Sequence, residues 1–179
     1  MLEAASVSTL DETAVDSVDS NDLPSGRFAA GLTDTPIGML QVVGVCLPWR
    51  DAHVRTGRKD RAAWEDHLAY LAAFEKLPYR NAAGRTLVLG DFNQRIPRRF
   101  QPKQVYAALR RAIEPLRIAT QGDIEGAPGP SIDHIAHTED LEPVGMGIWP
   151  MRDADNHRLS DHFGVWCDFR LRASGGLST

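Results

Sequence analysis

The 179-residue sequence is informative first through what it lacks. No stretch approaches the roughly 18 consecutive apolar residues of a membrane span, and the acidic start has no signal-peptide pattern, so we expect neither a membrane nor a secreted protein. There are only two cysteines, Cys46 and Cys167. They lack CxxC spacing and fit a reducing cytoplasm. The sequence leaves open whether the two cysteines form a disulfide with each other. GxGxxG, P-loop and repeat patterns are absent from the sequence.

A net basic charge is also absent. The formal net charge is −4, from 20 Lys+Arg and 24 Asp+Glu. Six of the acids and none of the bases lie within residues 1–26, so the remainder carries 18 acids and 20 bases. Since no overall basic field draws the protein to nucleic acid, a nucleic-acid substrate would need a local basic patch.

The length and the amino-acid composition fit one globular domain. Hydrophobic residues make up 42% and charged residues 25%, and a chain of this length can bury a real core. The leader is polar and acidic, with no sustained period, so we expect it to be flexible. The expected organisation is a flexible acidic leader over residues 1–25, a domain over 26–172 and a tail over 173–179.

Periodicity and turn residues predict the elements of this domain. Apolar runs bounded by turn residues predict strands, and apolar side chains at helical spacing predict helices. The strands are expected at Arg27–Gly31, Met39–Leu47, Thr86–Leu89, Ser131–Thr138, Glu142–Gly147 and Gly164–Arg170, and the helices at Asp60–Lys76 and between Pro102 and Pro115. This order favours a mixed α/β (α+β) layered fold over a regular Rossmann alternation.

The first candidate site follows the strand Thr86–Leu89. Gly90 ends this strand, so Asp91 would be held at its carboxyl edge, and Asn93, two residues further on, would point the same way. A carboxylate beside an amide suits metal or water activation, with the amide donating to a phosphate oxygen. A turn in which Asp91 and Asn93 cap their own backbone accounts for the same residues.

Two further segments place an acid next to a histidine. Asp133 and His134 lie within a predicted strand, where a buried acid needs a partner. Ser160, Asp161 and His162 directly precede the last predicted strand. Either segment alone is also typical of an ordinary structural junction.

Taken together and in this order, the three segments resemble the endonuclease/exonuclease/phosphatase family, which contains DNase I-like nucleases, abasic-site endonucleases and inositol-phosphate phosphatases. The family's recurring elements are GD-x-N, a later strand Asp and a terminal S-D-H. Here they read Gly90-Asp91-Phe92-Asn93, Ile132-Asp133-His134-Ile135 and Ser160-Asp161-His162. The resemblance runs from about residue 27 to 170 and implies a DNase I-like layered β-sandwich flanked by helices.

The resemblance also implies a role for each matching residue. Asp91 would orient or deprotonate the attacking water, and Asn93 would hydrogen-bond the scissile phosphate. His162 would contact the phosphate as general base or charge stabiliser, held in its tautomer by Asp133. Asp161 would lie near a divalent ion with Asp91, and hard oxygen ligands favour Mg²⁺ or Mn²⁺. In-line attack on phosphorus requires such a positioned water and neutralisation of negative charge.

The sequence departs from the family in two places. Family members begin with a further half that carries the main metal-binding Glu, and nothing before Arg27 resembles it. We therefore expect the C-terminal portion of a family member, lacking the N-terminal part, with weakened metal binding. The family's strand histidine is replaced by Cys46, which we interpret as a small buried hydrophobic residue, and Arg50 or His53 are candidates to replace the imidazole.

Arginines near the motifs are candidates for substrate binding. Arg95 and Arg98 follow Asn93 directly, and Arg50 follows the strand that ends in Leu47. These side chains suit a phosphate grip beside the site, and a solvated loop explains them as well.

Three other histidines need an interpretation. His134 and His137 are three residues apart on a strand and face opposite sides, so we do not expect them to form a metal pair. The Asp66-His67 dipeptide lies on a predicted helix and is expected at its surface.

We therefore expect a cytoplasmic, metal-dependent phosphoesterase with nuclease-like hydrolysis of phosphodiester bonds by direct water attack. Its expected substrate is a phosphoester, and nucleic acid is one candidate. We also expect a second copy of the chain to bind through the face that the missing half leaves open, and we expect no membrane partner. Two alternatives stay open. One is a catalytically impaired, truncated family member that acts in binding or assembly, and the other is a small-molecule phosphatase.

Overall fold

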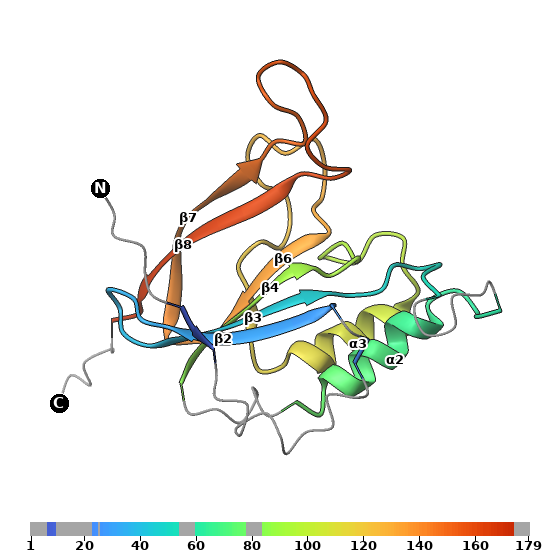
Figure 1. Ribbon diagram of the computed structural model, residues 1–179, viewed down its shortest axis with the longest axis horizontal. Coiled ribbons are helices and arrows are strands. Elements are labelled where there is room, and N and C mark those ends of the chain that lie inside the picture. Colours follow the sequence, from blue (N-terminus) through green and yellow to red (C-terminus); the bar gives the residue numbers. More distant parts are fainter. Residues whose placement is uncertain (1–6, 10–22, 25, 54–59, 78–83, 174–179) are drawn as a thin grey trace.

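The structure is a computed structural model that describes residues 7–9, 23–24, 26–53, 60–77 and 84–173. A six-stranded mixed sheet forms its centre, with two helices on one face and a two-stranded sheet on the other (Figure 1). In chain order the elements are β1 (Val7–Thr9), β2 (Phe28–Thr33), β3 (Leu40–Cys46), α2 (Glu65–Phe74), β4 (Arg85–Asp91), α3 (Lys103–Ile113), β5 (Arg117–Ile118), β6 (Asp133–His137), β7 (Leu141–Trp149) and β8 (Gly164–Leu171).

The large sheet has the strand order β1-β2-β3-β4-β6-β5, and β7 pairs with β8 in the small one. The β3–β4 pair is parallel and the other pairs are antiparallel. The helix α2 lies in the connection between the parallel strands, as a parallel crossover requires. The predicted α+β layered sandwich with flanking helices is confirmed.

Both faces of the large sheet are buried, which explains the continuous apolar runs in its central strands. Toward the helices, Val43 and Val88 pack with helix residues such as Phe74 and Leu109. Toward β7 and β8, Leu87 and its neighbours form a second core with residues of the small sheet. Alternate residues of β4 therefore serve two cores, and this fixes which side chains can reach the sheet edge.

Helix α3 follows the expected pattern closely. Val105, Leu109 and Ile113 are buried along one stripe, and burying each such side chain stabilises the fold by roughly 1.5–3 kcal/mol. Arg110 and Arg111 occupy the last turn, where cations interact favourably with the helix dipole.

All six predicted strands and both helices are present, with shifted ends. Helix α2 is shorter than the predicted Asp60–Lys76, and the two-residue strand β5 was not predicted. Within the leader, Val7–Thr9 forms a strand on the edge of β2. The other leader residues before Leu23 lie outside the described residues, so the expected flexibility of the leader stays a prediction, and the tail after residue 173 also lies outside them.

Several exposed apolar side chains lie on the small sheet, namely Val144, Met146, Trp149 and Leu171. The expected self-association depends on such a face and stays a prediction. Neither helix in the described part of the chain is long and apolar enough to cross a membrane.

Gly90 is the position where the backbone leaves no room for a side chain. Its φ is +133°, a region that is nearly exclusive to glycine, and a Cβ there would lie 2.0 Å from the carbonyl oxygen of Val45. Gly90 is the register partner of Val45 in the parallel β3–β4 pair. The close approach of the two strands directly before Asp91 therefore requires glycine.

We predict that Gly90→Ala lowers the free energy of unfolding by about 3 kcal/mol or more, because both backbone strain and overpacking oppose the added methyl group. Urea denaturation measures this change. Gly84→Ala is the matched control, since a Cβ at Gly84 would meet no atom within 4 Å and should change stability by less than about 0.5 kcal/mol. Equal effects of the two substitutions would contradict this explanation.

Candidate active site

The candidate site lies at the edge of the large sheet where three strands meet. Cys46 ends β3, Asp91 ends β4 and Asp133 begins β6. Asp91 is the register partner of both Cys46 and Asp133, so the three residues form one row across the sheet. In-register neighbours present their side chains to the same face. The pairing of β4 with β6 thus brings together two acids that are 42 positions apart in the sequence.

His162 approaches this row from the segment that precedes β8. Its Nδ1 lies 3.2 Å from Oδ2 of Asp133, and its Nε2 lies 4.0 Å from Oδ2 of Asp91. The Nδ1–Asp133 contact is a short ion-pair contact in which the ring is not aligned for a hydrogen bond. Asp161, which is largely exposed, has Oδ1 3.6 Å from the same Nε2. The three motif segments therefore converge, as expected from the sequence.

Asn93 braces Asp91. Its backbone N–H donates to Oδ1 of Asp91 at 2.8 Å, and its side-chain amide donates to Oδ2 at 2.8 Å and to the carbonyl of Leu47 at 2.8 Å. Its φ of 51° is left-handed, which Asn tolerates better than most residues. Both amide hydrogens are engaged, so a hydrogen bond from this amide to phosphate would require one of these bonds to break. Asn93 thus forms a local turn with Asp91, and the same hydrogen bonds fix the position of the Asp91 carboxylate.

Burial governs the protonation of the cluster. Burial raises the pKa of Asp91, against the lowering effects of the Asn93 hydrogen bonds and of His162. Burial also raises the pKa of Asp133, which faces His162 and the Asp91 charge. For His162, burial lowers the pKa, but Asp133 and Asp91 together outweigh it and the pKa is raised. The cluster therefore holds two partly desolvated carboxylates whose negative charge favours a nearby cation.

The donor set fits a divalent ion. Ligand atoms of Asp91, Asp133 and His162 all lie within 4.8 Å of one another. Carboxylate oxygens suit Mg²⁺ and Mn²⁺, and an imidazole nitrogen is better tolerated by Mn²⁺. Asp161 is outside this group but adjoins His162, so the expectation that Asp161 and Asp91 bind the ion stays a prediction.

A second acidic cluster, formed by Asp153, Asp155 and His157, lies in the exposed segment between β7 and β8. Asp153 there accepts the backbone N–H groups of Asp155 and His157. These hydrogen bonds explain the cluster as an ordinary turn.

The predicted substrate arginines separate into two groups. Arg50 and Arg95 line a cavity of about 580 Å³ together with Asn93, and Trp64 and Phe100 form part of its wall. Arg98 does not line this cavity: its Nη1 donates to the carbonyl of Gln101 at 3.0 Å, so it braces the loop. The cavity thus opens beside Asn93, which braces Asp91, and combines guanidinium groups with aromatic rings.

A buried polar network behind the site was missed by the sequence analysis. The expectation that Asp66 and His67 lie at the surface is wrong, since both are buried. His67 Nδ1 donates to the carbonyl of Pro48 at 2.7 Å, and Gln94 Nε2 donates to His67 Nε2 at 2.8 Å. His134 Nε2 in turn donates to the Gln94 carbonyl at 3.0 Å. This network fixes the loop that follows Asn93 against α2 and β6.

Arg27 is a second residue that the sequence analysis missed. Its Nη1 donates to the carbonyl of Cys46 at 3.1 Å and lies 3.3 Å from the Cys46 sulfur. It therefore brings a cation to the end of the row that contains Asp91. Burial raises the pKa of the Cys46 thiol, and Arg27 only partly offsets it, so Cys46 is a neutral thiol. Both cysteines are free. The only feature of the sequence that pointed to Arg27 was its place as the first residue of a predicted strand.

Comparison with solved structures identifies the fold. Family models give no match to the sequence, and neither do curated protein sequences. The chain resembles an endonuclease/exonuclease/phosphatase from Beutenbergia cavernae, with 19% identity, a TM-score of 0.51, and coverage of 95% of this chain and 45% of that one. It also resembles a Bacteroides vulgatus endonuclease/exonuclease/phosphatase, with 16% identity, a TM-score of 0.51, and coverage of 81% and 54%.

A third similar structure is D. rerio TDP2 in complex with a single-strand DNA product, with 13% identity, a TM-score of 0.52, and coverage of 80% and 61%. The chain spans about half the length of these solved structures. At such low identity the likeness concerns the fold alone. The fold is that of DNase I-like endonuclease/exonuclease/phosphatase domains, as the sequence motifs implied.

We predict a pH dependence of stability from His67. Burial lowers its pKa from an ordinary 6.5 to about 4 in the folded protein, so the unfolded chain binds the proton more readily. The stabilising contribution is complete above pH 6.5 and is lost as the pH falls from 6.5 toward 4, by up to about 3 kcal/mol. Urea unfolding between pH 7 and 4 measures it.

His67→Gln is the comparison for this prediction, because it removes the titrating group and should make the pH dependence shallower. NMR titration of the His67 ring in the unmodified chain provides a second measurement that does not depend on the variant. A ring that titrates near pH 6.5 would show that burial does not suppress its protonation.

Proposed function

We propose that the chain is a phosphoesterase of the endonuclease/exonuclease/phosphatase type that hydrolyses a phosphodiester bond by direct attack of water, with Mg²⁺ or Mn²⁺. The observation that carries this proposal is the convergence of Asp91, Asp133 and His162 at one sheet edge. The DNase I-like fold supports it at the level of the hydrolase class.

In this proposal each residue has a distinct part. Asp91 orients the attacking water and accepts its proton, a task favoured by its burial-raised pKa. Asn93 holds both oxygens of Asp91 in place. Asp133 pairs electrostatically with Nδ1 of His162 at 3.2 Å, and Nε2 of the same ring faces Asp91 and Asp161.

The raised pKa of His162 favours the role of a charge stabiliser that donates to a phosphate oxygen over that of a base. A divalent ion bound beside Asp91 and Asp161 would neutralise the charge that develops on the phosphate.

The cavity beside Asn93 favours a diester with a flanking aromatic group. Arg50 and Arg95 offer guanidinium donors for phosphate, and Trp64 and Phe100 offer surfaces on which a base can stack. Phe100 is 87% exposed, as expected for a ring that meets a ligand and not the core. TDP2, solved with a single-strand DNA product, has a similar fold, which supports a nucleic-acid substrate.

We predict that the purified chain hydrolyses a chromogenic phosphodiester with Mn²⁺, and that Asp91→Asn and His162→Ala lower kcat at least about 100-fold, as expected for loss of a general base or a charge stabiliser. Plasmid DNA and a chromogenic monoester rank the substrate classes. Arg152→Gln, in the exposed segment before β8, is the control that should leave the rate unchanged. Unchanged activity in Asp91→Asn and His162→Ala would contradict the proposal.

We also predict that Mn²⁺ affinity distinguishes the acids that bind the ion, Asp91 and Asp161, from Asp133, which pairs with His162. Calorimetric titration with Mn²⁺ should show at least about tenfold weaker binding in Asp91→Asn and Asp161→Asn. Binding should weaken less in Asp133→Asn, whose carboxylate is paired with His162, and should stay nearly unchanged in Asp153→Asn of the turn cluster. A loss in Asp133→Asn equal to that in Asp91→Asn would instead assign Asp133 to the ion.

A catalytically impaired domain is the second candidate function. Of the described residues, no glutamate joins the cluster of Asp91, Asp133 and His162, although the family's main metal ligand is a glutamate. Tight Mn²⁺ binding accompanied by turnover would exclude this alternative, and a folded chain without turnover would favour it.

A further inference from the structure

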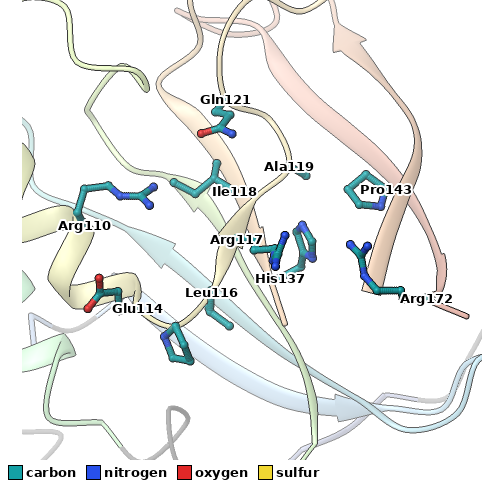
Figure 2. Close-up of a pocket in the computed structure, with 11 residues that line it drawn as sticks. Arg110, Glu114, Leu116, Arg117, Ile118, Ala119, Gln121, His137, Pro143 and Arg172 are labelled. Carbon is teal, nitrogen blue, oxygen red and sulfur yellow. The ribbon is translucent and has the colours of Figure 1, made fainter. Parts of the chain in front are cut away.

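A second cavity, of about 660 Å³, lies between the end of α3, the edge strand β5 and the start of β7 (Figure 2). Its wall includes three arginines from separate parts of the chain: Arg110 in the last turn of α3, Arg117 in β5 and Arg172 just after β8. Glu114 is the acid among the lining residues, and His137 lies between Arg117 and Arg172 (Figure 2). Arginines from distant segments of the chain therefore line one cavity.

The cavity is separate from the candidate active site. Asp133 of the active site begins β6 and His137 ends it, four residues further along the strand. At about 3.3 Å per residue the two ends of β6 are roughly 13 Å apart. The proposed hydrolytic reaction uses none of the arginines at this cavity.

Arg172 and Arg117, two of the three arginines, have protein partners for their side chains. Arg172 donates its Nε to the Glu139 carbonyl at 2.9 Å, and its backbone N–H donates to the Asp140 carbonyl at 2.7 Å. Arg117 forms an ion pair with the Glu139 side chain. The terminal nitrogens of Arg172 are not used by these bonds. With Arg110 included, the guanidiniums outnumber Glu114 and Glu139 by one.

His137 is buried in the wall of the cavity, and its Nδ1 donates to the Thr138 carbonyl at 2.9 Å. Burial lowers its pKa, and the charges of Arg117 and Arg172 lower it further.

We propose that this cavity binds a phosphate group through Arg117, Arg172 and Arg110. Guanidinium groups pair with phosphate oxygens through charge-assisted, bidentate hydrogen bonds, which a lone lysine or a neutral donor cannot reproduce. Leu116, Ile118 and Pro143 line the same cavity and offer apolar surface to the organic part of a phosphate ester. The phosphate belongs to a small phosphorylated molecule or to a nucleic-acid strand, and both present the same group.

Two probes distinguish these sources. Pyrophosphate is titrated calorimetrically into the full chain, and a fluorescein-labelled oligothymidylate is followed by fluorescence anisotropy, both with chelator present to exclude metal effects. Saturable binding of pyrophosphate indicates a small phosphorylated ligand, and saturable binding of the oligonucleotide alone indicates a nucleic-acid backbone. Either result supports the site if the variants below behave as stated.

Arg172→Gln and Arg117→Gln are expected to weaken binding at least about tenfold, the loss of about one charge-assisted hydrogen bond. Arg152→Gln removes the same charge from a different exposed segment and should bind like the unmodified chain. His162→Ala should also retain binding, because the phosphate does not occupy the active site. Thermal unfolding of each variant verifies that it is folded.

Three results would overturn the proposal. One is no saturable binding of either probe. Another is an equal loss in Arg152→Gln and Arg172→Gln, which would indicate only general charge attraction. The third is binding that is lost in His162→Ala but retained in Arg172→Gln, which would place the phosphate in the active site. None of these outcomes depends on whether the chain is an active hydrolase.

Discussion

The pairing of β4 with β3 on one side and β6 on the other is the constraint on which the site depends. Gly90 permits β3 and β4 to approach closely, and the next residue, Asp91, then falls in register with Cys46 and Asp133. A shift of one residue in the β4–β6 pairing would turn one of the two carboxylates to the other face of the sheet. Two acids held side by side at a partly buried edge repel each other, and this repulsion is what a cation or the imidazolium of His162 relieves.

Rigidity behind the site comes from neutral polar groups. Gln94 joins two buried histidines of α2 and β6, His67 and His134, and it directly follows Asn93. Each ring nitrogen of the two histidines has a hydrogen-bond partner, whereas the buried side-chain oxygen of Gln94 has none among the described residues. The left-handed backbone of Asn93 and of Trp64 lies at the same place, so local strain is concentrated where the site and its cavity meet.

Much of this arrangement follows from local sequence patterns. The apolar run that ends at Gly90 and the Asp-His pairs at strand ends predicted the residues that converge, because strand direction and alternation are local properties. The parallel pairing of β3 with β4 and the two-residue strand β5 depend on tertiary contacts that no short window contains. His67 was assigned to the surface because polarity normally indicates exposure, and only its partners Pro48 and Gln94, distant in sequence, make its burial favourable.

The central claim is that Asp91, Asp133 and His162 form the place where a divalent ion and a phosphate meet. Paramagnetic broadening by Mn²⁺ in a ¹H–¹⁵N correlation spectrum of the whole chain tests it most directly. We expect that substoichiometric Mn²⁺ broadens the amide signals of Asp91, Asn93 and His162 first, and that added phosphate changes this broadening. Broadening confined to the Asp153–His157 turn, or absent from the sheet edge, would contradict the claim.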